Sequence, residues 1–323
     1  MINFWQKLPR PFFALAPMYD VTDAAFRAMF AKYGSPDVFF TEFVSADGLA
    51  SVAGRDKLQR ELYYTEAERP IVAQIFGARP ETVATAAGLV ATLGFDGLDL
   101  NFGCPDRAVE KQGAGAALIK NSTLAQELIA AAKQGASALP VSVKTRIGYN
   151  RSEIEIWTEI LLVARPAAIT FHLRTRQDLS EAPARWEEIE IPVALAAGTE
   201  TLIIGNGDVR DLAEGRALAK RFGADGVMIG RGAFGRPWLF GGREPDWAGR
   251  LAMMLEHTRL FWDLYGPTET NRRLFNGHRK NFAVMRKHFK AYVGGRPGVA
   301  ELRLRLMTAQ NPDEVEEIIK PLL

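Results

Sequence analysis

The stretch Gly97-Leu98-Asp99-Leu100-Asn101-Phe102-Gly103-Cys104-Pro105-Asp106 runs from a short apolar segment into a loop that holds the only cysteine of the chain. Residues 97–102 have the length and composition of a buried β-strand. In an α/β protein, residues just past the carboxyl end of a strand line the crevice where ligands bind. Cys104 is therefore a candidate for chemistry, although a free cysteine is often only a small buried apolar side chain.

Seven further segments of this kind recur at near-regular intervals, and Ala- and Leu-rich stretches typical of helices follow them, such as 81–93, 124–133 and 212–222. The eight strand candidates are 12–17, 38–43, 71–76, 97–102, 141–146, 168–172, 201–206 and 226–230. Alternating strands and helices predict parallel strands with right-handed crossovers. Eight such units in about 240 residues favour an α/β fold of the closed (β/α)8 TIM barrel type over an open sheet.

The alternation breaks at Arg236-Pro237-Trp238, so we predict a barrel domain over residues 1–242 and a small all-helical domain over residues 243–323. Helices are expected at 248–265, 279–293, 299–308 and 312–322, with turns at 266–267, 294–295 and 311–312. In the second of these helices, Phe282, Met285, Phe289 and Tyr292 form one apolar stripe, while Arg279, Arg286 and Lys290 are expected on another side.

Basic residues are concentrated in this second domain. The whole chain has a net charge of +2, but residues 243–305 hold 13 Lys or Arg against six Asp or Glu. Residues 271–300 hold eight basic residues and no acidic one. This distribution favours a polyanionic partner, with Arg279, Arg286, Lys287 and Lys290 as its contacts. The alternative is an ordinary solvated helix face, balanced by the acidic residues of 313–317.

Composition restricts the remaining classes. A chain of 323 residues with 47% hydrophobic and 24% charged residues is neither disordered nor fibrous. One cysteine allows no internal disulfide, and the first 20 residues lack a secretion signal, so we expect a cytoplasmic protein. The longest apolar runs fall short of the roughly 20 residues of a membrane helix, so no membrane span is expected. Neither a metal site nor an obligate protein partner is indicated.

The predicted strand ends carry residues suited to a ligand. Pro17, Met18 and Tyr19 lie in a tight turn whose backbone amides suit a flat ligand. A buried Lys144 at the end of its strand is costly unless a negative charge meets it, so we expect an anionic ligand there. Taken alone, His172 fits a structural role and a ligand contact equally.

Glycine-rich turns follow the last two strands, at Asn206-Gly207-Asp208 and Gly230-Arg231-Gly232. Glycine lets backbone N–H groups approach a phosphate, and this fold often binds phosphate after strands seven and eight. Arg231 would add charge-assisted hydrogen bonds. A phosphate at one rim, Lys144 midway and the neutral Gln74 and Asn101 opposite describe a long ligand with a polar planar head. Flavin mononucleotide (FMN) fits, with Lys144 at its N1–O2 edge.

Together these motifs resemble the tRNA-dihydrouridine synthases of the bacterial type, over nearly the whole barrel. The most specific part is Asn-x-Gly-Cys-Pro at 101–105. The other matching segments are Ala16-Pro17-Met18, Val21-Thr22-Asp23, Phe26-Arg27, Thr41-Glu42, Gln74, 113–115, Lys144-Thr145-Arg146, Arg174-Thr175-Arg176, Asn206-Gly207-Asp208, 230–233, 235–238 and Met285-Arg286-Lys287-His288.

The resemblance implies FMN-dependent reduction of the C5–C6 double bond of a tRNA uridine, with NADPH as the reductant. Cys104 is then the proton donor to C5, Asn101 orients the base, and the basic helices hold the RNA while the uridine is turned out. The residues expected to bind FMN are Pro17, Met18, Tyr19, Gln74, Lys144, His172, Asn206, Gly207, Asp208, Gly230 and Arg231.

Two departures from the family pattern lie after the sixth strand. Leu173 replaces a small residue, and Leu179-Ser180-Glu181 replaces Tyr-Ser-Gly, so no RNA contact is assigned to this loop. Two alternatives stay open: an FMN-dependent dehydrogenase of a free pyrimidine or small enone, and a non-catalytic RNA-binding protein. The sequence does not distinguish NADPH from NADH, one tRNA uridine from another, or one oligomeric state from another.

Overall fold

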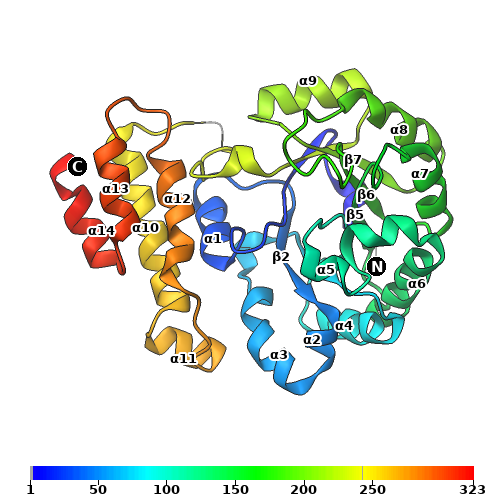
Figure 1. Cartoon of the computed structure of the whole chain (residues 1–323), viewed down its shortest axis with the longest axis horizontal. Helices are drawn as coiled ribbons and strands as arrows, with labels where there is room; N and C mark the ends of the chain where they lie inside the picture. Colours follow the sequence, from blue (N-terminus) through cyan, green and yellow to red (C-terminus); the bar gives the residue numbers. More distant parts are fainter. Residues whose placement is uncertain (1–2, 242) are drawn as a thin grey trace.

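A computed structural model describes residues 3–241 and 243–323. It contains one sheet of eight strands, and the helices of the barrel surround this sheet (Figure 1). The strands are β1 Phe12–Leu15, β2 Phe39–Ser45, β3 Ile71–Phe76, β4 Gly97–Phe102, β5 Val141–Arg146, β6 Ala168–His172, β7 Leu202–Asn206 and β8 Gly226–Ile229. They follow the order β1-β8-β7-β6-β5-β4-β3-β2. A parallel bridge between Ala14 and Val38 brings β1 beside β2. The predicted (β/α)8 barrel is confirmed.

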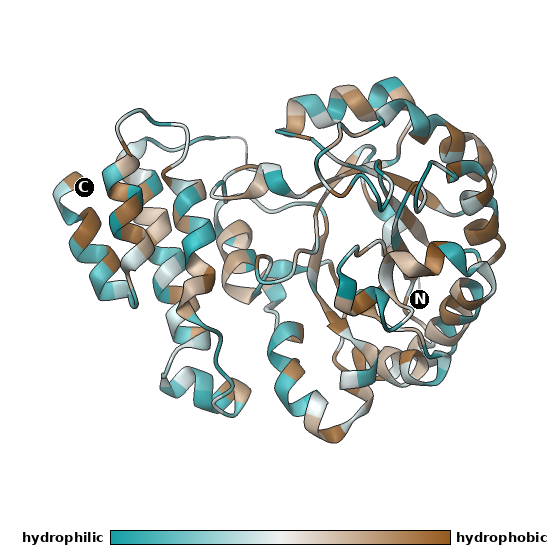
Figure 2. Cartoon of the chain, viewed as in Figure 1, coloured by the Kyte–Doolittle hydropathy of each residue, from teal (hydrophilic) through white to brown (hydrophobic). Residues whose placement is uncertain are grey.

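Helices cover the outside of this barrel. They are α1 Ala24–Tyr33, α2 Ala46–Ala50, α3 Val52–Leu58, α4 Pro80–Thr92, α5 Arg107–Glu110, α6 Ser122–Ala136, α7 Ile154–Val163, α8 Glu190–Ala196 and α9 Leu212–Phe222. A short 3-10 helix, Arg231–Ala233, follows β8. These helices carry both hydrophilic and hydrophobic residues along their length (Figure 2), as helices that pack on one side do.

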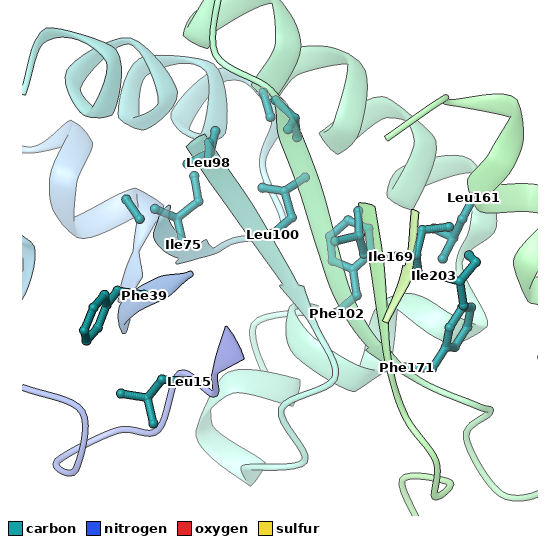
Figure 3. Close-up of a cluster of buried hydrophobic side chains, with 14 of the residues drawn as sticks. Leu15, Phe39, Ile75, Leu98, Leu100, Phe102, Leu161, Ile169, Phe171 and Ile203 are labelled. Atoms are coloured by element: carbon teal, nitrogen blue, oxygen red, sulfur yellow. The ribbon is translucent and has the colours of Figure 1, made fainter. Parts of the chain in front are cut away.

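Alternate residues of each strand point to opposite faces, and this places the polar side chains inside the barrel. On β4, Leu98, Leu100 and Phe102 belong to the apolar cluster between strands and helices (Figure 3). Asp99 and Asn101, between them, are also buried. The same alternation separates Lys144 on β5 from its apolar neighbours. The polar residues of the interior thus come from the inward positions of several strands.

A second group of helices follows the barrel: α10 Trp247–Tyr265, α11 Glu269–Phe275, α12 Met285–Tyr292, α13 Ala300–Thr308 and α14 Pro312–Ile319. We call residues 243–323 the helical region (Figure 1). Its apolar core continues onto the barrel, because Ala24 and Ala25 of α1 and Trp238 belong to the same cluster. The predicted boundary falls at residue 242, which lies outside the described residues. None of the helices in the described ranges is long and apolar enough to cross a membrane.

The predicted helix 279–293 is wrong in its first part. Helix α11 ends at Phe275, its C-cap residue Asn276 has a φ of 51°, and Gly277 follows with a φ of 80°. The chain then crosses a loop, and the side chain of Asn281 accepts a hydrogen bond from Ala283 N before α12 begins. Arg279 therefore lies in a loop and not on one helix face with Lys290. The expected apolar stripe of Phe282, Met285, Phe289 and Tyr292 is buried, as predicted.

Candidate active site at the barrel mouth

A cavity of about 580 Å³ opens at the carboxyl ends of the strands. Nine residues expected to bind FMN line it: Pro17, Met18, Lys144, His172, Asn206, Gly207, Asp208, Gly230 and Arg231. Arg174, Ser180 and Arg210 line it as well, and the sequence did not single them out as ligand contacts. Strands β1, β5, β6, β7 and β8 or the loops after them supply this wall.

The turn after β7 holds two arginines together. Asp208 accepts hydrogen bonds from Arg174 Nη2 and Arg231 Nη2, both at 2.5 Å, and from Ala184 N at 2.9 Å. Burial alone would raise the pKa of Asp208, but these hydrogen bonds and the two cations lower it. Gly207 has a φ of 133°, and a Cβ there would lie 2.7 Å from Ala184 Cβ, so only glycine fits this turn.

Lys144 places a half-buried cation midway along the cavity wall. No carboxylate oxygen of residues 3–241 or 243–323 lies within 4.0 Å of its Nζ. Burial, and then the charge of Arg146, lower the pKa of Lys144 to about 8, although Asp99 acts in the opposite direction. An ammonium group that is partly removed from water and has no counterion is unfavourable. The site is therefore suited to a ligand that brings negative charge to this position.

His172 is neutral in this surrounding. Burial, followed by the charges of Lys144, Arg146, Arg174 and Arg231, holds its pKa well below the ordinary value. Its Nε2 lies 3.2 Å from Arg174 Nη1. Because arginine only donates hydrogen bonds, Nε2 is the acceptor and the ring hydrogen is on Nδ1.

A chain of buried amides holds the loop of Cys104. Asn101 Oδ1 accepts hydrogen bonds from Gly103 N at 3.1 Å and from Cys104 N at 2.9 Å. Asn101 Nδ2 donates to Gln74 Oε1 at 2.9 Å, and Gln74 Nε2 donates to Asp99 Oδ2 at 2.7 Å. Burial raises the pKa of Asp99 to about 6, although hydrogen bonds from Ser142 and Gln74 act against it. The loop is thereby tied to the interior of the barrel.

The thiol of Cys104 is half-buried and lies outside the residues that line the cavity. Burial raises its pKa, while a backbone hydrogen bond at Asp106 and the charges of Arg146 and Lys144 act in the opposite direction. The thiol therefore keeps its proton at neutral pH. At the same time, nearby cations favour the thiolate that forms when the proton leaves.

Two predicted cofactor residues do not line the cavity. Gln74 is fully buried, and its side chain is hydrogen-bonded to Asp99 and Asn101. Tyr19 is 58% exposed, with its ring centroid 5.6 Å from that of Phe43. Two buried arginines of the site, Arg146 and Arg174, were not predicted as site residues. The signal that could have found them is their place in the family-like segments 144–146 and 174–176.

The chain is similar to known proteins over nearly its whole length. The profile described as "Dihydrouridine synthase (Dus)" matches residues 14–322. The chain is 40% identical to "Probable tRNA-dihydrouridine synthase 2" of Bacillus subtilis (strain 168), over 98% of this chain and 95% of that protein. It is also 40% identical to "Probable tRNA-dihydrouridine synthase" of Staphylococcus aureus (strain COL), over 98% and 94%. The chain belongs to the dihydrouridine synthase family. It is an oxidoreductase.

Solved structures with low sequence identity share the fold of this family member. Histamine dehydrogenase from Rhizobium sp. 4-9 matches with a TM-score of 0.53 at 15% identity, over 77% of this chain and 48% of that one. A 2-naphthoyl-CoA reductase matches with a TM-score of 0.51 at 12% identity, over 71% and 49%. The chain thus spans about half the length of these proteins, and the likeness concerns the barrel fold.

In this dihydrouridine synthase, the basic residues of the helical region differ in exposure. Arg279, Lys287 and Lys290 are exposed. Arg286 is half-buried, and its Nε is buried without a hydrogen-bond partner among residues 3–241 and 243–323. Lys280, in the same basic stretch, is buried and paired with Glu42. The surface that phosphates can reach is therefore smaller than the sequence count indicates.

Proposed function

We propose that this protein reduces the C5–C6 double bond of a uridine in tRNA, with FMN as bound cofactor and NADPH as reductant, and that it works in the cytoplasm. The observation that carries the proposal is the joint presence, at one barrel mouth, of a protonated thiol at Cys104 and a half-buried cation at Lys144 that has no counterion among the described residues. One group suits proton donation, and the other suits an anionic cofactor.

The residues of the cavity fit FMN in size and charge. The cavity volume of about 580 Å³ lies within the range of cofactor sites. Arg231, at the turn that follows β8, would meet the phosphate, and Lys144 would meet the flavin edge where negative charge collects. When bound, FMN supplies the hydride that reduces the uracil and takes its electrons from NADPH.

Cys104 completes the reaction by giving its proton to C5 of the base. A general acid must hold its proton at working pH, and burial of this thiol favours the protonated form. After the transfer, the charges of Arg146 and Lys144 stabilise the thiolate. Asn101 holds the backbone of this loop through its Oδ1 atom. We expect its remaining amide hydrogen to contact the polar edge of the base.

The helical region is the proposed RNA contact, through the exposed residues Arg279, Lys287 and Lys290 and the half-buried Arg286. Exposed cations bind a phosphate backbone without reading its sequence. A stacked uridine cannot reach the barrel mouth, so the base must be turned out at a cost of a few kcal/mol. Contacts elsewhere on the RNA offset that cost.

The test follows reduced flavin under anaerobic conditions. Purified protein is reduced with NADPH, and either a tRNA transcript or free uridine is added while flavin absorbance is recorded. We expect tRNA to reoxidise the flavin and to gain dihydrouridine by mass spectrometry, whereas free uridine reacts much more slowly. Equal reaction with free uridine would favour a dehydrogenase of free pyrimidines. Colourless protein that takes up no FMN would overturn the proposal.

A further inference from the structure

A buried lysine of the helical region lies against the wall of the barrel. Lys280 Nζ is 2.5 Å from Glu42 Oε2 on β2, and the two side chains are 4% and 0% exposed. The backbone N of Lys280 donates a hydrogen bond to Tyr265 O at 3.2 Å, and its ammonium group lies 5.2 Å from the centre of the Tyr265 ring. Contacts on both sides therefore fix this lysine.

Glu42 connects Lys280 with the turn after β1. Its other oxygen, Oε1, accepts a hydrogen bond from Asp20 N at 2.6 Å. Within the same turn, Met18 N donates to Thr22 Oγ1 at 2.9 Å, and Thr22 N donates to Met18 O at 3.0 Å. Met18 lines the cofactor cavity. One ion pair and one backbone hydrogen bond thus join the helical region to the cavity wall.

Carboxylates are in excess around this lysine. Asp23 and Glu61 are buried beside Glu42, and Asp23 Oδ2 and Glu61 Oε2 have no hydrogen-bond partner within the described part of the chain. Glu61 also accepts a hydrogen bond from Arg60 Nε at 2.8 Å. Lys280 is the one cation paired with Glu42 among the residues that the structure describes. Its removal leaves buried carboxylates facing one another, and such an arrangement is strongly unfavourable.

We propose that Lys280 is a positioning residue, which through Glu42 holds the turn of residues 17–22 in the shape that binds the cofactor. The helical region then completes the cofactor site in addition to its contact with RNA. This inference rests on the proposed function, since it concerns FMN. The Cys104 loop is held separately through Asn101 and Gln74. Loss of Lys280 should therefore weaken FMN binding and leave proton donation almost unchanged.

The experiment compares FMN dissociation constants, measured by flavin fluorescence on apoprotein whose fold is verified by circular dichroism. We expect Lys280→Met to raise the constant about tenfold or more and Lys280→Arg, which keeps the charge, to raise it less than about threefold. The matched control is Glu256→Gln. This substitution removes the ion pair of Lys32 on α1 with Glu256 on α10, in which Lys32 Nζ lies 2.6 Å from Glu256 Oε1. Like the Lys280 pair, it connects the barrel to the helical region, but it includes no residue of the turn 17–22. Its constant should equal that of the unaltered protein.

A second measurement separates positioning from general damage. With saturating FMN, Lys280→Met should form dihydrouridine in a single turnover within about threefold of the unaltered rate. Unchanged FMN affinity in Lys280→Met, or equal losses in the Met and Arg variants, would overturn the inference. If Lys280→Met does not fold, Glu42→Gln, which keeps the acceptor for Asp20, must weaken FMN binding or the inference fails. Failure of the unaltered protein to bind FMN would instead overturn the proposed function.

Discussion

Arg146, Arg174 and Lys144 at the barrel mouth differ from the exposed lysines of the helical region in their contact with water. Arg174 is 2% exposed and Arg146 6%, and Lys144 is half-buried. Lys287 and Lys290 on α12 are exposed. A buried cation has lost its hydration and needs one matched partner. An exposed cation keeps its hydration and attracts any polyanion. Salt screens this attraction, with a screening length of about 8 Å at physiological ionic strength.

This difference separates two tasks that the sequence merges into one positive charge. The buried group suits a single small anion in a defined position, as a cofactor requires. The exposed group suits an RNA backbone that can approach in several registers. Cys104, which also lies after a barrel strand, belongs to neither group of cations. Four predictions test this division, in order of decreasing effect.

The largest effect is expected for Cys104→Ala. Loss of a general acid should slow dihydrouridine formation by about 100-fold to 10,000-fold, because the thiol is the group assigned to protonate C5. FMN content and tRNA affinity should stay unchanged. The measurement is single-turnover product formation by mass spectrometry. Cys104→Ser serves as control and should also be slow, since a hydroxyl is a much weaker acid; normal turnover in the Ala variant would remove the assigned role.

The second prediction concerns Lys144→Met. The apoprotein should become more stable, because a pKa of about 8 in place of the ordinary 10.5 means that burial of this ammonium group costs on the order of 3 kcal/mol at neutral pH. The cost is present below pH 8 and disappears as the pH rises towards 10.5. FMN affinity should fall about 100-fold, since the cation for the flavin is lost. Urea unfolding and flavin fluorescence measure the two effects.

The matched control is Lys220→Met, at an exposed position on α9. It should change neither quantity. If Lys144→Met keeps full FMN affinity, this cation is not matched to the cofactor, and the comparison between the two regions breaks down.

A third prediction follows from the same pKa. Between pH 7 and pH 9 the Lys144 ammonium group of the free protein loses its proton, so FMN affinity should decrease by up to about tenfold over this interval. Bound FMN should shift the loss to higher pH, because an anion stabilises the charged lysine. Titrations from pH 7 to pH 9 provide the measurement. The Lys144→Met variant should show a flat profile, and a flat profile in the unaltered protein would contradict the assignment.

The smallest effect is expected on the exposed side. The double variant Lys287→Glu and Lys290→Glu should bind tRNA about fivefold more weakly at physiological salt, with a shallower dependence on salt. Its FMN affinity should not change. Gel shifts at several salt concentrations measure this effect. Unaltered tRNA binding would show that this face is only a solvated surface.

Local sequence patterns were sufficient for most of the barrel. The predicted boundaries of β3, β4 and β5 agree with the structure, because short apolar runs between turn residues are local signals. The Cys104 loop was located in the same way. Helix 279–293 was placed wrongly because the apolar stripe outweighed the signals at Gly277 and Asn281, where the backbone turns and a new helix begins.

The sequence by itself determined the eight-stranded barrel, the single thiol after the fourth strand and the excess of positive charge near the end of the chain, since each depends on neighbouring residues. Only the tertiary structure decided which charges remain in water. Lys280 and Glu42 are 238 positions apart in the sequence, yet they form a buried pair. Burial depends on which distant segments pack together, so the role of each charged residue is a property of the fold.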